Sequence, residues 1–375
     1  MMASHLTLIV KVTNACNMRC RYCFIEPEIF HQTMSVATMQ RVVRAFLDSP
    51  QLSSIQFVWY GGEPLLRGRG FFEQIIAEQQ ARPTQVRFAN AGQTNATHLD
   101  DDLLELLTTS GFHIGLSLDG PARVNQRSRK LRVVRDTDAH AVTIAAAARL
   151  REHGQTPAAI VVVNRLNIGA AAAIYREFKL RGIEMQLNPL VQSGLAAAGE
   201  EDLGITADEY GDFLVRMFDL WFDDPHPTIS IEPFRHHIAR ILGVATAPNC
   251  HFARSCHRSF LGISPRGDLF PCGMFQGEPE FRYGNIHELA PEDVAGTALF
   301  DRIDRREQRV LETCSRCVFL DLCYSGCMFH SLKNQRAFEE KDYYCGSYKQ
   351  YFEHVLRRLH ADLTRARHQL DAPAT

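Results

Sequence analysis

Residues 16–23 read Cys-Asn-Met-Arg-Cys-Arg-Tyr-Cys and directly follow an apolar, β-branched stretch over residues 6–12. The thiolates of Cys16, Cys20 and Cys23 at this spacing can hold three irons of a cubane iron–sulfur cluster, which leaves the fourth iron without a protein ligand. An iron with an open position can bind a small molecule and carry out chemistry, which a fully ligated electron-transfer cluster cannot. The competing interpretation is a zinc site, since cysteine pairs two residues apart are common there.

The composition limits the classes of protein that need to be considered. A chain of 375 residues with 45% hydrophobic and 22% charged residues is typical of a globular protein with one large and one smaller domain. The net charge of −2 gives no argument for nucleic acid or an acidic membrane as a partner. No stretch approaches the about eighteen apolar residues of a membrane span, and residues 1–5 carry no basic run of a secretory signal. We therefore expect a cytoplasmic protein.

The chain contains eleven cysteines. Thiols stay reduced in the cytoplasm, so this number favours metal or cluster ligation over a disulfide framework, and the odd count agrees with that. Four histidines could add ligands, but we expect them to be solvated surface residues: His236, His237, His251 and His257.

Apolar segments alternate with segments of helical periodicity through the first half of the chain. Strands that alternate with helices of this length imply βαβ units, a parallel sheet and right-handed crossovers. Six such units predict an α/β fold with an open, partial (β/α)6 barrel rather than the closed eight-strand form. Ser35 is expected to be the N-cap of the first helix. The strands are expected at residues 6–12, 54–60, 85–90, 112–118, 158–163 and 184–189, and the helices at 35–47, 71–80, 99–109, 140–153, 170–181, 207–222 and 233–242.

Polar and glycine-containing motifs follow four of the predicted strands. The first motif is the cysteine loop, residues 16–23. The others are Gly-Gly-Glu-Pro at residues 61–64, Gln-Thr-Asn at residues 93–95 and Ser-Leu-Asp-Gly at residues 117–120. Parallel barrels present their active sites at the C-terminal ends of the strands. We therefore expect the four motifs to contribute to one functional rim.

The cysteine spacing, with the aromatic Tyr22 just before the last cysteine, resembles the signature of the radical S-adenosylmethionine (SAM) superfamily. The resemblance covers most of residues 5–225. It implies that the open iron of a [4Fe–4S] cluster chelates the amino and carboxylate groups of SAM. It also implies that an electron from the cluster cleaves the sulfonium, and that the resulting 5′-deoxyadenosyl radical removes a hydrogen atom from the substrate.

The same resemblance assigns cofactor contacts to further residues. The Gly-Gly-Glu-Pro turn corresponds to the site of the methionine ammonium group, although such a turn can also be purely structural. Ser117 and Arg129 match positions that contact the ribose and the methionine carboxylate, and Arg127 competes with Arg129 for the second role. The residues expected to bind SAM are Tyr22, Gly62, Glu63, Ser117 and Arg129.

The remaining eight cysteines lie between residues 250 and 345, at spacings that resemble the SPASM extension of peptide and sulfatase maturases. Eight is the number needed for two fully ligated [4Fe–4S] clusters. The alternative is a pair of structural zinc sites. Similarity to anaerobic sulfatase-maturing enzymes implies interleaved ligand sets. The proximal set is expected to be Cys250, Cys256, Cys272 and Cys327, and the distal set Cys314, Cys317, Cys323 and Cys345.

The expected domains are a radical SAM core over residues 1–225, a bridging helical segment over 226–249, a SPASM domain over 250–350, and a C-terminal helix and tail over 351–375. Because the first predicted strand begins at residue 6, we expect no small leader-peptide-binding domain of the kind found on many peptide-modifying relatives. Leader recognition is therefore expected from a separate protein or from the surface of the barrel and its extension. A low-potential donor such as flavodoxin or ferredoxin is expected to supply electrons.

Three [4Fe–4S] clusters and SAM predict a net two-electron oxidation, because fully ligated auxiliary clusters can accept an electron from a substrate radical. The SPASM resemblance implies a precursor peptide or protein as substrate. In sulfatase-maturing members an aspartate follows the third cysteine of the extension and is the proposed base, whereas this chain has Gly273. No catalytic base is identified. We therefore predict a ribosomal-peptide maturase that crosslinks or dehydrogenates a side chain, ahead of a sulfatase-maturing enzyme that forms formylglycine.

Two further classes stay open. A small-molecule radical SAM dehydrogenase would use the same chemistry, but its extension typically carries fewer cysteines. A non-catalytic iron–sulfur scaffold or redox sensor would explain the cysteines, but neither the turn at residues 61–64 nor the positions of Ser117 and Arg129.

Overall fold

The computed structural model describes all residues except 132–137, 200–201, 245–248 and 372–375. It contains two compact units, each assembled from separate parts of the chain. The first unit comprises residues 1–19, 25–115 and 255–308, and the second comprises residues 20–24, 116–254 and 309–375. The cysteine-rich segment after residue 250 therefore contributes to both units.

A largely parallel sheet runs through the first unit, with the strand order β10-β9-β8-β1-β2-β3-β4. β1 pairs in parallel with β2 on one side and with β8 on the other, and β2 pairs in parallel with β3. β9 and β10 continue the sheet in antiparallel orientation. The elements are β1 (His5–Thr13), α1 (Val36–Leu47), β2 (Ser54–Gly61), α2 (Arg69–Gln80), β3 (Arg87–Thr94), α3 (Asp101–Thr109), β4 (Phe112–Ser117), α10 (Cys256–Ser259), β8 (Phe260–Ile263), β9 (Asp268–Phe270), β10 (Gly284–Asn285) and α11 (Ala298–Thr313), whose last turn continues into the second unit.

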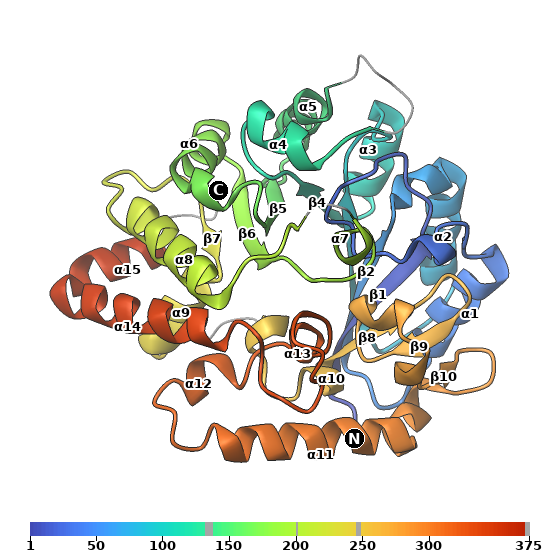
Figure 1. Ribbon diagram of the computed structural model, residues 1–375. Helices are drawn as coiled ribbons and strands as arrows, with labels where there is room; N and C mark the ends of the chain where they lie inside the picture. Colours follow the sequence, from blue (N-terminus) through green and yellow to red (C-terminus); the bar gives the residue numbers. More distant parts are fainter. Residues whose placement is uncertain (132–137, 200–201, 245–248, 372–375) are drawn as a thin grey trace. The chain divides into compact units, whose positions relative to one another are not determined.

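The predicted strands and helices of the first unit are present, with small differences at their ends. Helices α1 and α2 pack against each other beside β1 and β2 (Figure 1). Ser35 is the N-cap of α1, as predicted, because its hydroxyl accepts a hydrogen bond from the N–H of Thr38 at 3.0 Å.

β3 differs most from its prediction, because it continues to Thr94 where the hydrophobic pattern ends at residue 90. Asn90 is buried inside the unit, and its side-chain oxygen accepts hydrogen bonds from Trp59 Nε1–H at 2.8 Å and from the Gln79 amide at 3.0 Å. Asn90 lies within the predicted range, whereas the added residues begin with Ala91 and Gly92, which carry no hydrophobic alternation. Parallel pairing of these two residues with β2 extends the strand, and a rule based on periodicity does not recognise such an extension.

The second unit has three parallel strands in the order β5-β6-β7, and the peptide N–H of Leu118, just after β4, bonds to β5. Helices connect the strands, and others are formed by the C-terminal segment. The elements are α4 (Ala122–Ser128), α5 (Ala139–Glu152), β5 (Ala158–Val163), α6 (Ala171–Arg181), β6 (Glu184–Pro189), α7 (Leu195–Ala198), α8 (Ala207–Phe222), β7 (Ile231–Glu232), α9 (Phe234–Ile241), α12 (Leu320–Cys323), α13 (Met328–Asn334), α14 (Cys345–Ala361) and α15 (Leu363–Asp371).

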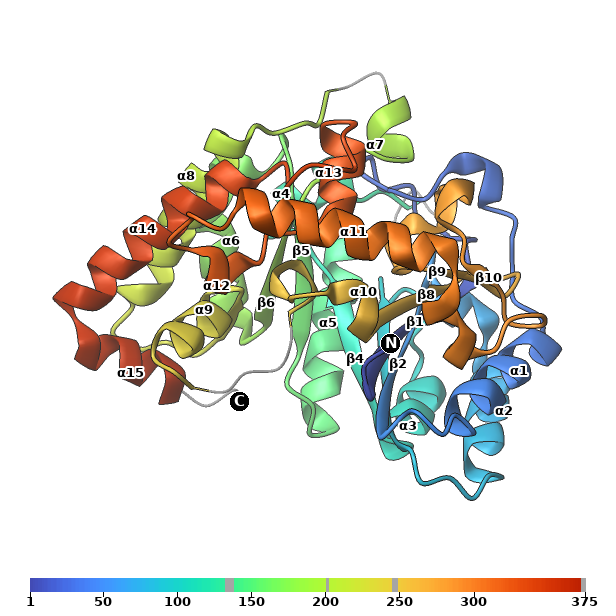
Figure 2. The ribbon, with the colours of Figure 1, turned by 90° about the horizontal axis from the view of Figure 1, so that it is seen from below.

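The C-terminal helix α14 packs along α8, and the two run side by side in both ribbon views (Figure 1, Figure 2). Phe218 of α8 contacts Tyr351 of α14 and Phe234 of α9, with ring centroids 5.9 and 5.5 Å apart. At the edge of this aromatic contact, His354 Nε2 lies 2.7 Å from Asp219 Oδ1. Helix α14 is thus anchored to α8, which connects the parallel strands β6 and β7.

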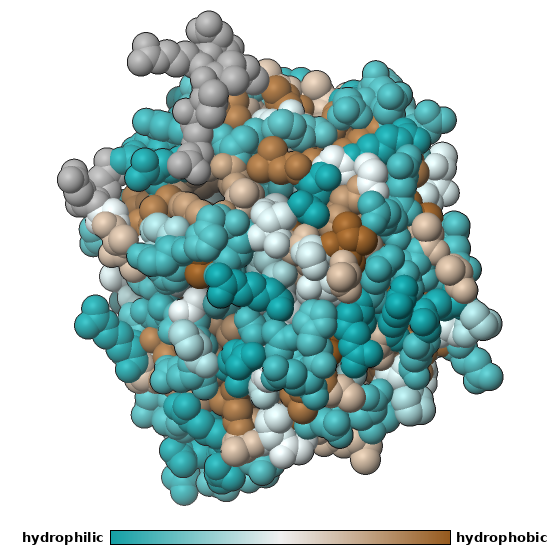
Figure 3. Space-filling model, turned by 90° about the vertical axis from the view of Figure 1, so that its right-hand side faces the viewer, coloured by the Kyte–Doolittle hydropathy of each residue, from teal (hydrophilic) through white to brown (hydrophobic). Residues whose placement is uncertain are grey.

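Hydrophobic side chains are concentrated inside the units, where Trp59 and Trp221 are among the largest fully buried residues. The face drawn in Figure 3 is mainly hydrophilic, and its hydrophobic side chains form small, separate spots. Within the described part of the chain, no helix combines the length and apolar character needed to cross a membrane.

Glu232 of β7 generates a prediction about stability. Burial, opposed by Arg235 and by the backbone N–H of His236, raises the pKa of Glu232 to about 7. The folded state therefore keeps a proton that the unfolded state has already lost between about pH 4.5 and pH 7, so the contribution of Glu232 to stability falls as the pH rises through this range. Glu232→Gln should leave stability unchanged near pH 4 and raise the free energy of unfolding by about 1–3 kcal/mol near pH 8.

Urea unfolding of both proteins at the two pH values measures this difference. Glu353→Gln, which changes an exposed carboxylate of α14, is the control and should behave like the parent protein at both values. An effect of Glu232→Gln that does not depend on pH would contradict the assignment.

Candidate active site

The cysteine loop directly follows β1, and its thiols divide between the two units. Cys16 belongs to the first unit, whereas Cys20 and Cys23 belong to the second. The N–H of Met18 lies 3.3 Å from Cys16 Sγ, and the N–H of Cys23 donates to the carbonyl of Cys20 at 3.1 Å. These turns leave all three cysteines half-buried.

The Gly-Gly-Glu-Pro turn at the end of β2 lies against the backbone that leads into the cysteine loop. The N–H of Gly62 donates to the Thr13 carbonyl at 2.8 Å. The N–H of Glu63 donates to the Ala15 carbonyl at 2.9 Å. A Cβ atom on Gly62 would lie 2.3 Å from the Ala15 oxygen and 2.4 Å from the Asn14 oxygen. Glycine is therefore required here by the close approach of another backbone segment of the chain.

Glu63 is completely buried, and its carboxylate accepts hydrogen bonds from the protein itself. Oε1 accepts from the N–H of Leu65 at 2.9 Å and from the Thr94 hydroxyl at 2.7 Å. Oε2 accepts from the N–H of Asn95 at 2.8 Å. Glu63 therefore fastens the turn to the end of β3 and organises the segment in which the sequence predicts the ammonium site.

Asn14 is a candidate site residue that sequence reasoning missed. Its side chain is 1% exposed, and neither its amide nitrogen nor its amide oxygen has a hydrogen-bond partner among the described residues. Burying a polar group without a partner costs about 1–3 kcal/mol. An unpaired amide two residues before Cys16 and next to the Gly-Gly-Glu-Pro turn therefore fits a site that a polar ligand completes. Asparagine at the end of a strand gives no signal of this kind in the sequence.

Tyr22 and Arg129 form a buried pair in the second unit. Arg129 Nη1 donates to the Tyr22 hydroxyl at 2.7 Å, and each residue is 8% exposed. Burial opposes the charge of Arg129, but Cys20, Tyr22 and Asp119 together raise the pKa of its guanidinium well above the usual value. Arg127, the competing candidate, is exposed to solvent. Of the two arginines, Arg129 is the one next to a cysteine of the loop.

Asp119 supports this pair, although the sequence analysis did not single it out from its motif. Its carboxylate accepts hydrogen bonds from the Ser128 hydroxyl at 2.7 Å and from the N–H of Val162 at 3.2 Å. Burial raises the pKa of Asp119, against the opposing effects of Arg129 and of these donors. Ser117 is the last residue of β4 and is half-buried.

The four cysteines of the distal set line one cavity in the second unit. The cavity encloses about 490 Å³, part of it open to solvent, and Lys341 and Lys349 also line it. Burial and the neighbouring thiols raise the pKa of Cys323 to about 12. Thiolates are the ligands of metals and iron–sulfur clusters, so four cysteines gathered at one cavity fit a site that a metal or cluster completes. The residues brought together are Cys314, Cys317, Cys323 and Cys345.

The proximal set divides between the units, with Cys256 and Cys272 in the first and Cys250 and Cys327 in the second. Cys256 and Cys272 are both within electrostatic reach of Tyr283. Burial raises the pKa of Cys272 to about 11, against the opposing effects of two backbone N–H groups and of the buried Lys11.

Gly273 follows Cys272 and is buried against β1. A Cβ atom at this position would lie 2.6 Å from Cγ2 of Ile9, closer than side-chain atoms approach one another. The chain therefore lacks a carboxylate at position 273 and also lacks the space for one.

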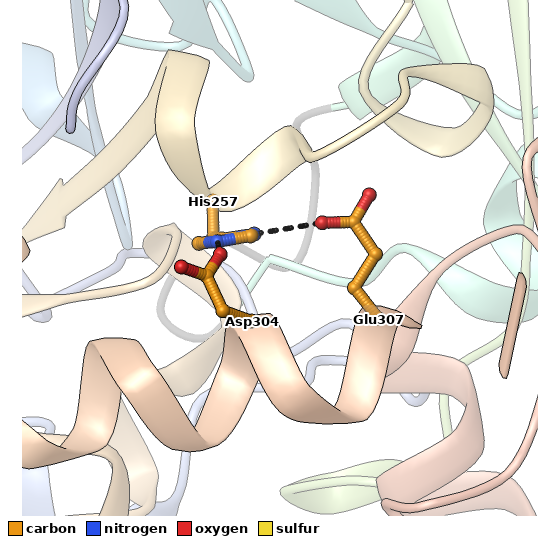
Figure 4. Close-up of side chains that lie close together, drawn as sticks. All are labelled: His257, Asp304 and Glu307. Atoms are coloured by element: carbon orange, nitrogen blue, oxygen red, sulfur yellow. Dashed lines mark hydrogen bonds and ion pairs between the residues drawn. The ribbon is translucent and has the colours of Figure 1, made fainter. Parts of the chain in front are cut away.

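His257, Asp304 and Glu307 face one another, with both acids on α11 (Figure 4). His257 Nε2 lies 2.7 Å from Asp304 Oδ1. Arg258 donates to the other Asp304 oxygen at 2.5 Å, and Glu307 accepts from the N–H of Ser255 at 2.7 Å. Because protein donors already engage both carboxylates, we interpret the group as a clamp on the loop that carries Cys256 rather than as a metal site.

The expectation that the four histidines are solvated is wrong for three of them, and His251 is half-buried. His236, His237 and His257 are buried, with exposures of 6%, 0% and 2%. The ring of His251 packs against that of His330, with centroids 5.1 Å apart. Spacing along the sequence cannot separate a buried histidine from an exposed one when the surrounding helices are short.

Residues 10–177 match the Radical SAM superfamily, so the chain contains a radical SAM domain. This range begins in β1 and ends in α6, and it includes the cysteine loop, the Gly-Gly-Glu-Pro turn and Arg129. The resemblance inferred from the cysteine motif is confirmed.

Over nearly its whole length, the chain is similar to anaerobic sulfatase-maturating enzymes. The cysteine-type enzyme of Clostridium perfringens strain 13 is 27% identical over 370 residues, which cover 94% of this chain and 97% of that enzyme. The serine-type enzyme of Bacteroides thetaiotaomicron is 25% identical over 378 residues, which cover 94% and 90% of the two chains.

Solved structures share the fold. Native anSMEcpe with bound AdoMet and the Kp18Cys peptide has a TM-score of 0.82 at 24% identity, covering 95% of this chain and 98% of that one. Streptococcus suis SuiB bound to its precursor peptide SuiA has a TM-score of 0.66 at 17% identity, covering 92% and 76%. The predicted fold class, a radical SAM α/β domain with a cysteine-rich SPASM-type extension, is confirmed.

The contact of Gly62 with residues 14–15 generates a prediction. Gly62→Ala should displace the backbone before Cys16, at a cost of about 1–3 kcal/mol for overpacking. We expect the variant to lose the spectral change that SAM causes in the reduced, anaerobically reconstituted protein. Gly70→Ala in α2 is the matched control, because a Cβ there meets nothing within 4 Å. Normal SAM binding by Gly62→Ala would contradict the role given to this contact.

The four-cysteine cavity generates a second prediction, on metal content. Cys323→Ser should remove about four irons per chain and leave the other clusters in place. Iron, acid-labile sulfide and zinc are measured in anaerobically purified parent and variant. Zinc in place of iron, with four or fewer irons per parent chain, would show that the C-terminal cysteines hold structural zinc.

Proposed function

We propose that this protein is a radical SAM maturase that oxidises a side chain of a peptide or protein substrate. The favoured reaction is conversion of a cysteine or serine to formylglycine, as in anaerobic sulfatase maturation. The observation that carries the proposal is similarity to sulfatase-maturating enzymes over 94% of this chain and 97% of the relative. Taken alone, Gly273 would favour crosslinking over formylglycine formation. The similarity to sulfatase-maturating enzymes favours formylglycine formation instead.

The proposed cofactors are SAM and three [4Fe–4S] clusters, one on the cysteine loop and two on the C-terminal cysteines. When bound, they would supply the radical that removes a substrate hydrogen atom and the acceptor for the remaining electron. A flavodoxin or ferredoxin as donor, and a separate leader-recognition protein, stay predictions.

The residues of the chain would bind and orient these groups. Gly62 and Glu63 shape the turn beside Cys16, and the unpaired amide of Asn14 is available to the polar end of SAM. The buried guanidinium of Arg129, held by Tyr22, offers a fixed positive charge to a carboxylate. Because these groups are buried and largely preorganised, little reorganisation is needed when the cofactor binds.

Gly273 favours a second candidate function. Formylglycine formation needs a proton acceptor near the substrate carbon, and position 273 cannot provide one because Ile9 occupies the space. Crosslinking or dehydrogenation of a peptide side chain by a base elsewhere, or by the substrate itself, does not require this position. The two candidates share the radical step and differ in the product.

Anaerobic incubation with dithionite, SAM and a pair of sulfatase-derived peptides, Cys-x-Pro-x-Arg and its serine counterpart, distinguishes them. We expect 5′-deoxyadenosine together with an aldehyde at the cysteine or serine, detected by mass and by an aldehyde-reactive probe. Peptides with alanine at that position, and protein with Cys16, Cys20 and Cys23 changed to serine, are the controls.

Formation of 5′-deoxyadenosine without aldehyde on either peptide would favour the second candidate. Absence of 5′-deoxyadenosine from the fully reconstituted protein would contradict both and leave a non-catalytic iron–sulfur protein.

A further inference from the structure

Asp342 lies in the second unit between two segments that carry cysteines of different proposed clusters. It is 2% exposed, and it is three residues before Cys345, a member of the distal set. The segment of Cys327, a member of the proximal set, contacts its side chain. An acidic residue buried to this degree is uncommon unless it has specific partners.

The carboxylate of Asp342 uses both oxygens to hold backbone N–H groups. Oδ2 accepts from the N–H of Cys327 at 2.7 Å, and Oδ1 accepts from the N–H of Tyr344 at 2.8 Å. The backbone carbonyl of Asp342 accepts from the N–H of Cys345 at 3.1 Å. One residue is therefore bonded to the peptide groups of a proximal and of a distal cysteine.

His330 completes the arrangement from α13. Its Nδ1 lies 3.0 and 3.1 Å from the two oxygens of Asp342, and it is 2% exposed. The His330 ring packs against His251, the neighbour of Cys250, with centroids 5.1 Å apart. A second cysteine of the proximal set is thereby connected to the same pair.

The side chains of Asp342 and His330 are engaged by other groups of the protein, and we do not interpret them as a metal site. Both oxygens of Asp342 already accept backbone N–H groups, which leaves neither oriented solely toward an ion. Although burial opposes ionisation, His330 and these N–H groups hold the pKa of Asp342 below its usual value.

We propose that Asp342 is a positioning residue that fixes the ligand segment of the proximal auxiliary cluster relative to that of the distal one. This inference rests on the cluster assignment of the proposed function. The rate of electron transfer between cofactors depends on their separation, so a residue that joins the two ligand segments would influence transfer between clusters held there.

Asp342→Asn tests the arrangement, because an amide has one acceptor oxygen where the carboxylate uses two. Either the N–H of Cys327 or that of Tyr344 then faces another donor. We expect loss of about four irons per chain, or altered EPR signals of the auxiliary clusters in dithionite-reduced protein. The SAM-dependent change at the N-terminal cluster, and 5′-deoxyadenosine formation without peptide, should stay at the parent level.

Glu353→Gln is the matched control, since it makes the same chemical change on an exposed residue of α14. Because Asp342→Asn can fail to fold, His330→Asn provides a second test. The asparagine amide can still donate where Nδ1 does, but the ring contact with His251 is lost, so we expect full iron content with shifted auxiliary EPR signals.

The outcomes separate this inference from the proposed function. A parent protein with about twelve irons, and variants with the same iron content and EPR spectra, would overturn the role of Asp342 alone. A parent protein without auxiliary iron would overturn the cluster assignment and this inference with it.

Discussion

The close contact between the end of β2 and the backbone after β1 is the constraint on which the candidate site depends. Gly62 and Glu63 donate to the carbonyls of Thr13 and Ala15, and no larger residue than glycine fits at position 62. The strand end and the cysteine loop therefore cannot move independently. A central strand of a parallel sheet is among the most rigid parts of a protein, and this contact transmits that rigidity to Cys16.

Buried polar groups divide into those that the protein satisfies and those that it does not. Glu63, Asp119 and Asp342 each accept several hydrogen bonds from neighbouring donors, and such satisfied networks fix the shape of their surroundings. Asn14 is different, because its amide is buried without a partner among the described residues. Other buried polar atoms also lack a partner among the described residues, but Asn14 is the one two residues before Cys16, so it is the group that a ligand at the cysteine loop would complete.

Much of the fold could be predicted because hydrophobic periodicity dominates where strands and helices are amphipathic or apolar. β1, β5, β6, α1 and α8 follow the predicted ranges closely. β3 does not, since Ala91 and Gly92 carry no hydrophobic alternation and join the strand by pairing with β2. The pairing of β8 with β1 is also invisible in the sequence, because only the folded chain brings residues 260–263 beside residues 7–10. Cysteine spacing identified the radical SAM domain, whereas the hydrogen bonds of Asp119 and Asp342 and the burial of Asn14 arise only in the folded chain.

The packing of Gly273 against Ile9 has a consequence for engineering. A side chain at position 273 would force Ile9 or the neighbouring backbone to shift, unless a smaller residue replaced Ile9. The two positions are separated by more than two-thirds of the chain, and yet the residue at one limits the size of the residue at the other. Transplanting the missing base into this scaffold, for example to retarget it to a new substrate, would require both exchanges together.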